Sequence, residues 1–149
     1  MQQCRHCLAK MEPRNGRCPV CGIDPNARPA SLSPREKTVR RHARGIRMVA
    51  MFHLVAAGTG IVLINRLAPL PMVLFALVNV VIAFGLARYA FLAYKAAVVY
   101  YFLIGMVNVI SIQHGPVHLG GIILSLIALY LVGNGTAKAI FERNLLDPV

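Results

Sequence analysis

The residues best suited to chemistry in this sequence are its four cysteines, which all lie within the first 21 residues. They form two Cys-x2-Cys pairs separated by ten residues: Cys4, Cys7, Cys18 and Cys21. Each pair can turn two thiolates toward one ion, and two such pairs supply the four ligands of a closed tetrahedral zinc site. The sequence therefore predicts that these four cysteines bind one structural Zn²⁺.

A segment this short cannot bury a useful apolar core, so a metal must hold it together. Zinc binding to peptides of this kind is worth on the order of 10–16 kcal/mol, which is enough to fold it. Two disulfides are the alternative, but they need an oxidising compartment, and the charge pattern described below places the segment in the cytoplasm. His6, between two of the cysteines, is expected to be a surface residue rather than a ligand.

Residues Cys4 to Gly22 resemble the short zinc ribbons at the head of many bacterial membrane proteins, in which two Cys-x2-Cys-Gly knuckles are joined by a hairpin. The sequence departs from this family at Leu8, where glycine is usual, and at Arg17, where an aromatic residue often stands. The second knuckle, which runs from Cys18 to Gly22, also resembles one half of a rubredoxin-type iron site. Iron in place of zinc therefore stays open as an alternative.

Two long apolar stretches follow the cysteines. Between Met48 and Ala87 the only charged side chain is Arg66, and from Ala96 to Ala137 there is none. Each stretch is about twice the roughly 20 residues that a helix needs to cross a bilayer, so each must fold back once. The turns are marked near the middle of each stretch, by Pro69 and Pro71 in the first and by Gly115-Pro116 in the second.

The predicted fold is an all-α integral membrane protein, a four-transmembrane-helix bundle with a short N-terminal zinc ribbon. The expected helices lie near residues 46–65, 70–88, 95–113 and 118–137. The expected organisation is a zinc ribbon at 1–25, a basic juxtamembrane linker at 26–45, a transmembrane domain at 46–140 and a cytoplasmic tail at 141–149.

The charge of the chain predicts its orientation. Sixteen Lys and Arg residues stand against five Asp and Glu, which gives a formal net charge of +11, and eleven of the basic residues precede Met48. Lys and Arg near the ends of spans are retained on the cytoplasmic side. Both termini are therefore predicted to be cytoplasmic, with Arg66 alone outside, in the cytoplasmic (inner) membrane of a bacterium.

The basic linker has the pattern of a helix start at Ser33-Pro34-Arg35-Glu36, with Ser33 as N-cap and Glu36 at the third position. A helix beginning near Pro34 is expected to run into the first span. Its basic residues are expected to attract anionic headgroups of the membrane lipid. Nucleic acid is not expected as a partner, because the first 51 residues contain no aromatic side chain on which a base could stack.

Few polar residues interrupt the apolar stretches, and each is costly in lipid unless it has a partner. Hydrogen bonds between helices are expected for this set, namely His53, Asn79, Asn108, Ser111, Ser125 and Asn134. His53 and Asn134 are expected near the cytoplasmic side, and Asn79 and Asn108 deeper. A role in function for His53, Asn79 and Asn108 stays open beside one in packing. Four tyrosines are expected to form an interfacial belt: Tyr89, Tyr94, Tyr100 and Tyr101.

The sequence shows no set of residues typical of a catalytic site. The predicted function is a non-enzymatic membrane protein whose cytoplasmic zinc ribbon mediates protein interaction, as an adaptor, a regulator or an accessory subunit of a membrane complex. A small transporter or channel formed by several copies of the chain is the first alternative, since small residues recur at spacings that allow close helix packing. An iron-binding electron-transfer protein is the second.

Overall fold

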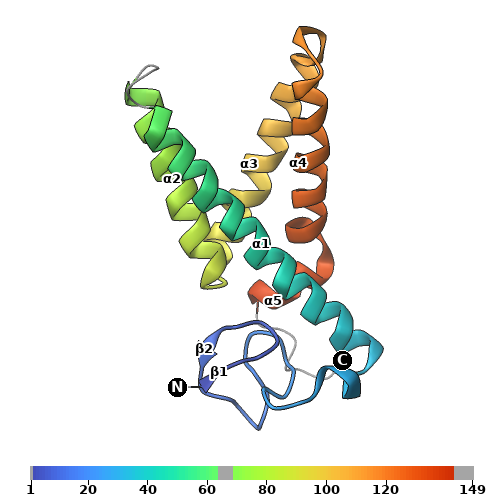
Figure 1. Ribbon diagram of the computed structural model, residues 1–149. Helices are drawn as coiled ribbons and strands as arrows, with labels where there is room; N and C mark the ends of the chain where they lie inside the picture. The colour runs from blue at the N-terminus through green and yellow to red at the C-terminus, as the bar shows by residue number, and fades with distance from the viewer. Residues whose placement is uncertain (1, 64–68, 143–149) are drawn as a thin grey trace.

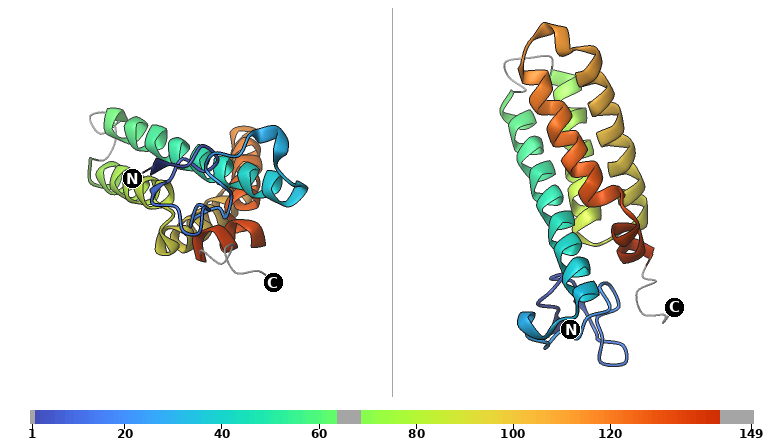
Figure 2. Two further views of the ribbon diagram at one scale, coloured as in Figure 1. Left: turned by 90° about the horizontal axis from the view of Figure 1, so that it is seen from below. Right: turned by 90° about the vertical axis from the view of Figure 1, so that its right-hand side faces the viewer.

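The computed structural model describes residues 2–63 and 69–142. In these ranges four long helices are followed by a short one: α1 (Pro34–Leu63), α2 (Pro69–Ala87), α3 (Phe91–Ile110), α4 (Val117–Gly133) and α5 (Gly135–Glu142). α1 packs along α2 and α3 along α4, so the long helices form two hairpins that diverge from a common base (Figure 1). α5 lies across that base, where it contacts α1, α3 and α4 (Figure 2).

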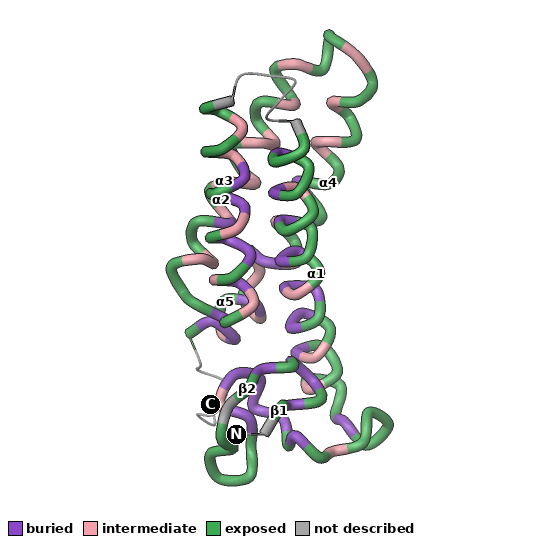
Figure 3. The backbone as a smooth tube through the Cα atoms, turned by 60° about the vertical axis from the view of Figure 1, so that its left-hand side comes forward, coloured by how far each residue is buried: buried purple, intermediate pink, exposed green. Residues whose placement is uncertain are grey.

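The helices carry the apolar surface of a membrane protein. Within the described residues α1, α2 and α3 are long and apolar enough to cross a membrane, and α4 with α5 gives a fourth if the bent pair is one span. The outer faces of these helices are exposed along most of their length (Figure 3). They present large apolar side chains such as Val81 and Leu92. Lipid, and not water, is the solvent in which such a surface is stable.

α1 begins where the sequence predicts. The Ser33 Oγ accepts a hydrogen bond from the Glu36 backbone N–H at 3.3 Å, and the Glu36 Oε2 accepts one from the Ser33 backbone N–H at 2.9 Å. This reciprocal pair is a capping box, which satisfies two backbone donors at the helix start. From Pro34 onward the basic segment is therefore the first part of α1, and the helix continues into the apolar stretch without a break.

Removing this cap should loosen the start of α1. We expect Ser33→Ala to destabilise the first turns by about 1 kcal/mol, measured as reduced amide protection of residues 37–41 in hydrogen exchange. The bonds from Ser33 lower the pKa of Glu36. The contribution of the carboxylate is therefore present above the ordinary pKa of a glutamate and is lost as the pH falls through the lowered value. Thr38→Ala is the control, because the Thr38 hydroxyl bonds only the Pro34 carbonyl. Equal loss of amide protection in Ser33→Ala and Thr38→Ala would contradict the capping role.

The ends of the helices differ from the prediction to unequal degrees. α2 agrees with the expected 70–88 within one residue at each end, whereas α3 begins four residues before the expected 95 and ends three before the expected 113. A 3-10 turn, η2 (Ile112–His114), then leads into the last hairpin loop. The expected end of the first helix at residue 65 and most of the tail at 141–149 lie outside the described residues.

The predicted fourth helix over 118–137 is broken near its end. α4 ends at Gly133, the chain takes an extended conformation at Asn134, and α5 leaves at an angle of 50°. The Asn134 Oδ1 accepts a hydrogen bond from the Ala137 backbone N–H at 2.9 Å, so Asn134 is the N-cap of α5. The expected hydrogen bond from Asn134 to another helix is therefore wrong, because its side chain is used within its own segment.

The residues before α1 contain little regular structure. Two-residue strands β1 (Gln2–Gln3) and β2 (Lys10–Met11) pair antiparallel, and a 3-10 turn, η1 (Pro29–Ser31), precedes the capping box. A tight turn at Asn15-Gly16, both with positive φ, joins Arg14 to Arg17. We call residues 2–23 the cysteine module; it lies below the base of the two hairpins (Figure 1).

Candidate metal centre

The four cysteines predicted as ligands lie together inside the cysteine module. Their Sγ atoms are all within 4.8 Å of one another. The Cys4 and Cys21 sulfurs are 3.7 Å apart, and the Cys7 and Cys18 sulfurs 3.6 Å. Four sulfurs placed tetrahedrally about one Zn²⁺ at the usual Zn–S length would be about 3.8 Å apart. The cluster therefore has the donor atoms and the size to hold one metal ion.

Two turns of the same kind position the four sulfurs. In the first knuckle the Leu8 backbone N–H donates to the Cys4 carbonyl, and in the second the Gly22 backbone N–H donates to the Cys18 carbonyl, both at 2.8 Å. Leu8 and Gly22 each have a positive φ, of 61° and 69°. Glycine takes this conformation without cost, which explains the glycine that is usual after each knuckle in the ribbons that this segment resembles. Leu8 adopts the same turn despite its side chain.

The thiols of the cluster influence one another strongly. Hydrogen bonding with Cys18 lowers the pKa of Cys4, and hydrogen bonding with Cys21 lowers the pKa of Cys18 to about 7. The same kind of contact, chiefly with Cys18, raises the pKa values of Cys7 and Cys21. Only a bound cation lets four thiolates this close ionise together. Four protein ligands fill a tetrahedral ion, so such a centre would be structural.

The prediction that His6 lies at the surface is wrong. Its side chain is 1% exposed, and neither ring nitrogen has a hydrogen-bond partner among the described residues. The candidate metal group nonetheless contains the four cysteines alone. A module of this size has almost no interior, so the residue between two knuckle cysteines fills part of it.

The cysteine module is fastened to the base of the hairpins. The Tyr89 hydroxyl, from the connection between α2 and α3, donates to the Cys7 carbonyl at 2.7 Å and lies 3.3 Å from the Ala43 carbonyl in α1. The Arg47 Nη2 donates to the Leu8 carbonyl at 2.8 Å. Both contacts reach the first knuckle, so the module is held against the base of the helices and is not free on its linker.

Apolar packing joins the module to the helices as well. Val20 and Ile23 are fully buried, and they share one continuous core with Leu32, Ile140 and Phe141. One apolar core is therefore formed jointly by the module, by its connection to α1 and by α5. A metal ion held by the four cysteines would organise the module and, through this shared core, would also support the base of the helical bundle.

Tyr89 is the residue of this site that the sequence analysis misplaced. It is 2% exposed instead of belonging to an interfacial belt, and its φ of 54° is rare for a residue other than glycine. The Ala90 and Tyr89 backbone N–H groups donate to the Gly85 and Leu86 carbonyls, so Tyr89 stands where a helix-ending motif usually has glycine. Burial raises the pKa of Tyr89, which keeps its hydroxyl a donor. The strained backbone persists because the side chain anchors the module.

Comparison with known protein families, with curated proteins and with solved structures gives no match for this chain.

A second group of polar residues lies in the apolar part of the bundle. The Asn79 Nδ2 donates to the Phe75 carbonyl at 2.8 Å, so its Oδ1 is the atom that faces His53 Nδ1 at 2.7 Å. His53 must therefore carry its proton on Nδ1. In the other hairpin the Asn108 Oδ1 lies 3.2 Å from His118 Nδ1. The expected interhelical bonds of Asn79 and Asn108 are confirmed.

His53 lies at the level of Asn79, to which it is hydrogen-bonded, whereas Asn79 was expected deeper in the membrane than His53. The His53 ring lies between the rings of Tyr100 and Tyr101, with centroid distances of 5.2 and 5.3 Å. These residues and Ser125 line a cavity of about 310 Å³ between the two hairpins.

Breaking the His53–Asn79 pair should destabilise the first hairpin. We expect Asn79→Leu to cost about 1–2 kcal/mol, because it leaves the His53 Nδ1–H buried without an acceptor. Unfolding in detergent micelles measures the change, and the double variant with His53→Phe should recover part of the loss. Thr59→Val is the control, since Thr59 is exposed and bonds only within α1. A loss no larger than that of Thr59→Val would contradict the role of the pair.

Proposed function

We propose that this chain is a non-enzymatic membrane protein whose zinc-bound ribbon binds a partner protein, which makes it an adaptor, a regulator or an accessory subunit of a membrane complex. The observation that supports this is the attachment of a buried four-cysteine cluster to the base of the hairpins through Tyr89 and Arg47. A module held in this way presents one fixed surface and moves with the helices. A partner bound to it would be coupled to the membrane part.

The surface that the module offers is basic. Its exposed side chains include Arg5, Lys10, Arg14 and Arg17, and the Asn15-Gly16 turn forms its tip. A partner with an acidic surface fits this charge. Photo-crosslinking from position 15 in native membranes should capture that partner. Arg14→Glu should abolish the adduct, while Lys138→Glu, near the end of the chain, should leave it unchanged. An adduct that persists in Arg14→Glu and after removal of the metal would contradict the proposal.

We propose that the module and both termini lie in the cytoplasm of a bacterial inner-membrane protein, an orientation that the distribution of basic residues favours. Cysteines introduced at Arg28, before α1, and at Val117, at the opposite end of the bundle, form a matched pair. An impermeant maleimide added to intact cells should label Val117→Cys and not Arg28→Cys. Labelling of Arg28→Cys alone would reverse the proposed topology.

Zinc is the proposed metal, because four buried thiolates in a closed tetrahedron suit it and it has no redox chemistry. Iron at the same cysteines would instead support electron transfer. Metal analysis of protein purified from native membranes decides between the two. One zinc per chain is expected, and one iron with visible absorbance would favour the electron-transfer alternative.

The cavity lined by His53 and Asn79 supports a second candidate, an oligomeric transporter or channel. Polar groups in the apolar part of a bundle mark many transport paths. Flux through liposomes that contain the chain would support this function. Flux that persists in Asn79→Leu would show that these residues do not form the path.

A further inference from the structure

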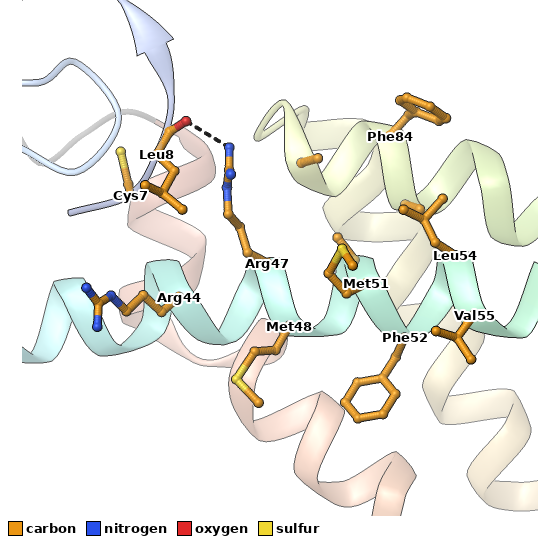
Figure 4. A pocket seen from close by; sticks show the side chains of 13 residues that line it. Cys7, Leu8, Arg44, Arg47, Met48, Met51, Phe52, Leu54, Val55 and Phe84 are labelled. Carbon is orange, nitrogen blue, oxygen red and sulfur yellow. Dashed lines mark hydrogen bonds between the residues drawn. The ribbon is translucent and has the colours of Figure 1, made fainter. Parts of the chain in front are cut away.

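A groove of about 790 Å³ runs along the outside of the first hairpin, from the cysteine module into the apolar part of the bundle (Figure 4). Its floor is formed by α1 and by Ala83, Phe84 and Ala87 of α2. Cys7 and Leu8 of the first knuckle close one end. The groove therefore touches both the module and the helices, at the junction between them.

The two ends of the groove differ in chemistry. Arg44 and Arg47 are the last charged residues of α1, and both line the end near the module. Beyond them the lining is apolar and exposed, as at Met51, Val55 and Phe84, which are 61%, 65% and 56% exposed. The boundary between the polar and apolar parts of α1 thus crosses the groove. A ligand that fits it must have an anionic end and an apolar end.

The cationic end has unused hydrogen-bonding capacity. Arginine has five N–H donors, and among the described residues Arg47 bonds the Leu8 carbonyl and interacts with the Tyr89 hydroxyl. Its Nε is buried without a partner there. Arg44 is exposed one turn earlier on α1. Among the described residues no carboxylate lines the groove, so these residues leave its positive charge unbalanced locally.

We propose that this groove binds one anionic phospholipid, with its phosphate at Arg44 and Arg47 and an acyl chain along Met51, Val55 and Phe84. Basic pockets at the membrane surface bind anionic headgroups through such arginines. The lipid would sit against Leu8, whose carbonyl already accepts the Arg47 bond. It would therefore contact the cysteine module and the membrane helices at once. This assignment goes beyond diffuse attraction of the basic segment to a charged bilayer, because it names one groove.

The test uses the full metal-loaded chain in phosphatidylcholine nanodiscs that contain phosphatidylglycerol as the probe lipid. The protein is then released into detergent, and native mass spectrometry counts the lipid molecules that it retains. One retained phosphatidylglycerol per chain is expected. Arg44→Gln should weaken its retention about fivefold, since one basic residue at the surface is worth about that factor. Val55→Trp should weaken it as well by filling the apolar end. Arg41→Gln, which removes an exposed charge outside the groove, should leave it unchanged.

Three results would overturn the proposal. If Arg44→Gln and Arg41→Gln weakened lipid retention equally, the lipid would be attracted diffusely to the whole basic segment and not bound in the groove. Full retention in Val55→Trp would show a headgroup contact without a chain in the groove. Displacement of the lipid by millimolar inorganic phosphate would show a site for free anions. Arg47 is left unchanged in these variants because it also holds the module.

Discussion

Cys18→Ser should release the metal and unfold the cysteine module, while the membrane helices stay folded. Cys18 supplies one of four sulfurs that lie within 4.8 Å of one another, and metal binding of this type is worth on the order of 10–16 kcal/mol. No apolar core inside a segment of this size can replace that free energy. Metal content should fall from one equivalent per chain to nearly none, and trypsin should cut rapidly at Arg14 and Arg17.

His6→Ala is the matched control for the ligand set. His6 lies between two of the cysteines and is buried, but it is not in the candidate metal group. The variant should retain one metal ion even if the module becomes less stable. Metal lost from His6→Ala and kept in Cys18→Ser would contradict the assignment of the four cysteines.

Tyr89→Phe should detach the module from the bundle without removing the metal. The substitution deletes the hydroxyl that donates to the Cys7 carbonyl at 2.7 Å, and it keeps the ring against Phe141, where the ring centroids are 5.9 Å apart. A buried carbonyl left without its donor costs about 1–3 kcal/mol. A cost of 1–3 kcal/mol makes the state in which the module has separated from the helices roughly 5- to 150-fold more populated. The rate at which an excess of chelator removes the metal should rise by that factor.

Tyr94→Phe makes the same chemical change nearby. Tyr94 contacts Phe91 and Phe141 through its ring, and no hydrogen bond of its hydroxyl is found among the described residues. The Tyr94→Phe variant should therefore lose its metal to the chelator at the same rate as the unchanged chain. An equal acceleration in Tyr94→Phe and Tyr89→Phe would mean that the Cys7 contact does not hold the module.

Features set by local spacing were predicted well from the sequence. The Cys-x2-Cys pairs predicted the cluster of four cysteines, because both thiols of a pair lie in one turn. The capping box at Ser33 and Glu36 was found because a cap depends on residues three apart. The apolar stretches marked the helices for the same reason, since length and hydropathy decide whether a segment can span lipid.

Features that depend on the packing of distant segments were missed. Tyr89 contacts Cys7, 82 residues earlier, and nothing in its neighbourhood distinguishes it from a tyrosine at a membrane interface. Asn134 and Asn79 are both asparagines in an apolar stretch, so their sequence surroundings look alike. Asn134 nevertheless caps α5, whereas Asn79 pairs with His53. Glycines on both sides of Asn134 were the one local sign of a break. The shared level of His53 and Asn79 was missed because it depends on how α1 packs against α2.

The most direct test of a metal-organised module that is part of the bundle is hydrogen exchange of the full chain in nanodiscs, before and after chelation. Removal of the metal should expose the amides of residues 4–23 and also those of the connection at residues 88–90 and of α5, while the middle of α1 stays protected. Loss of protection confined to residues 4–23, or no change at all, would contradict the account.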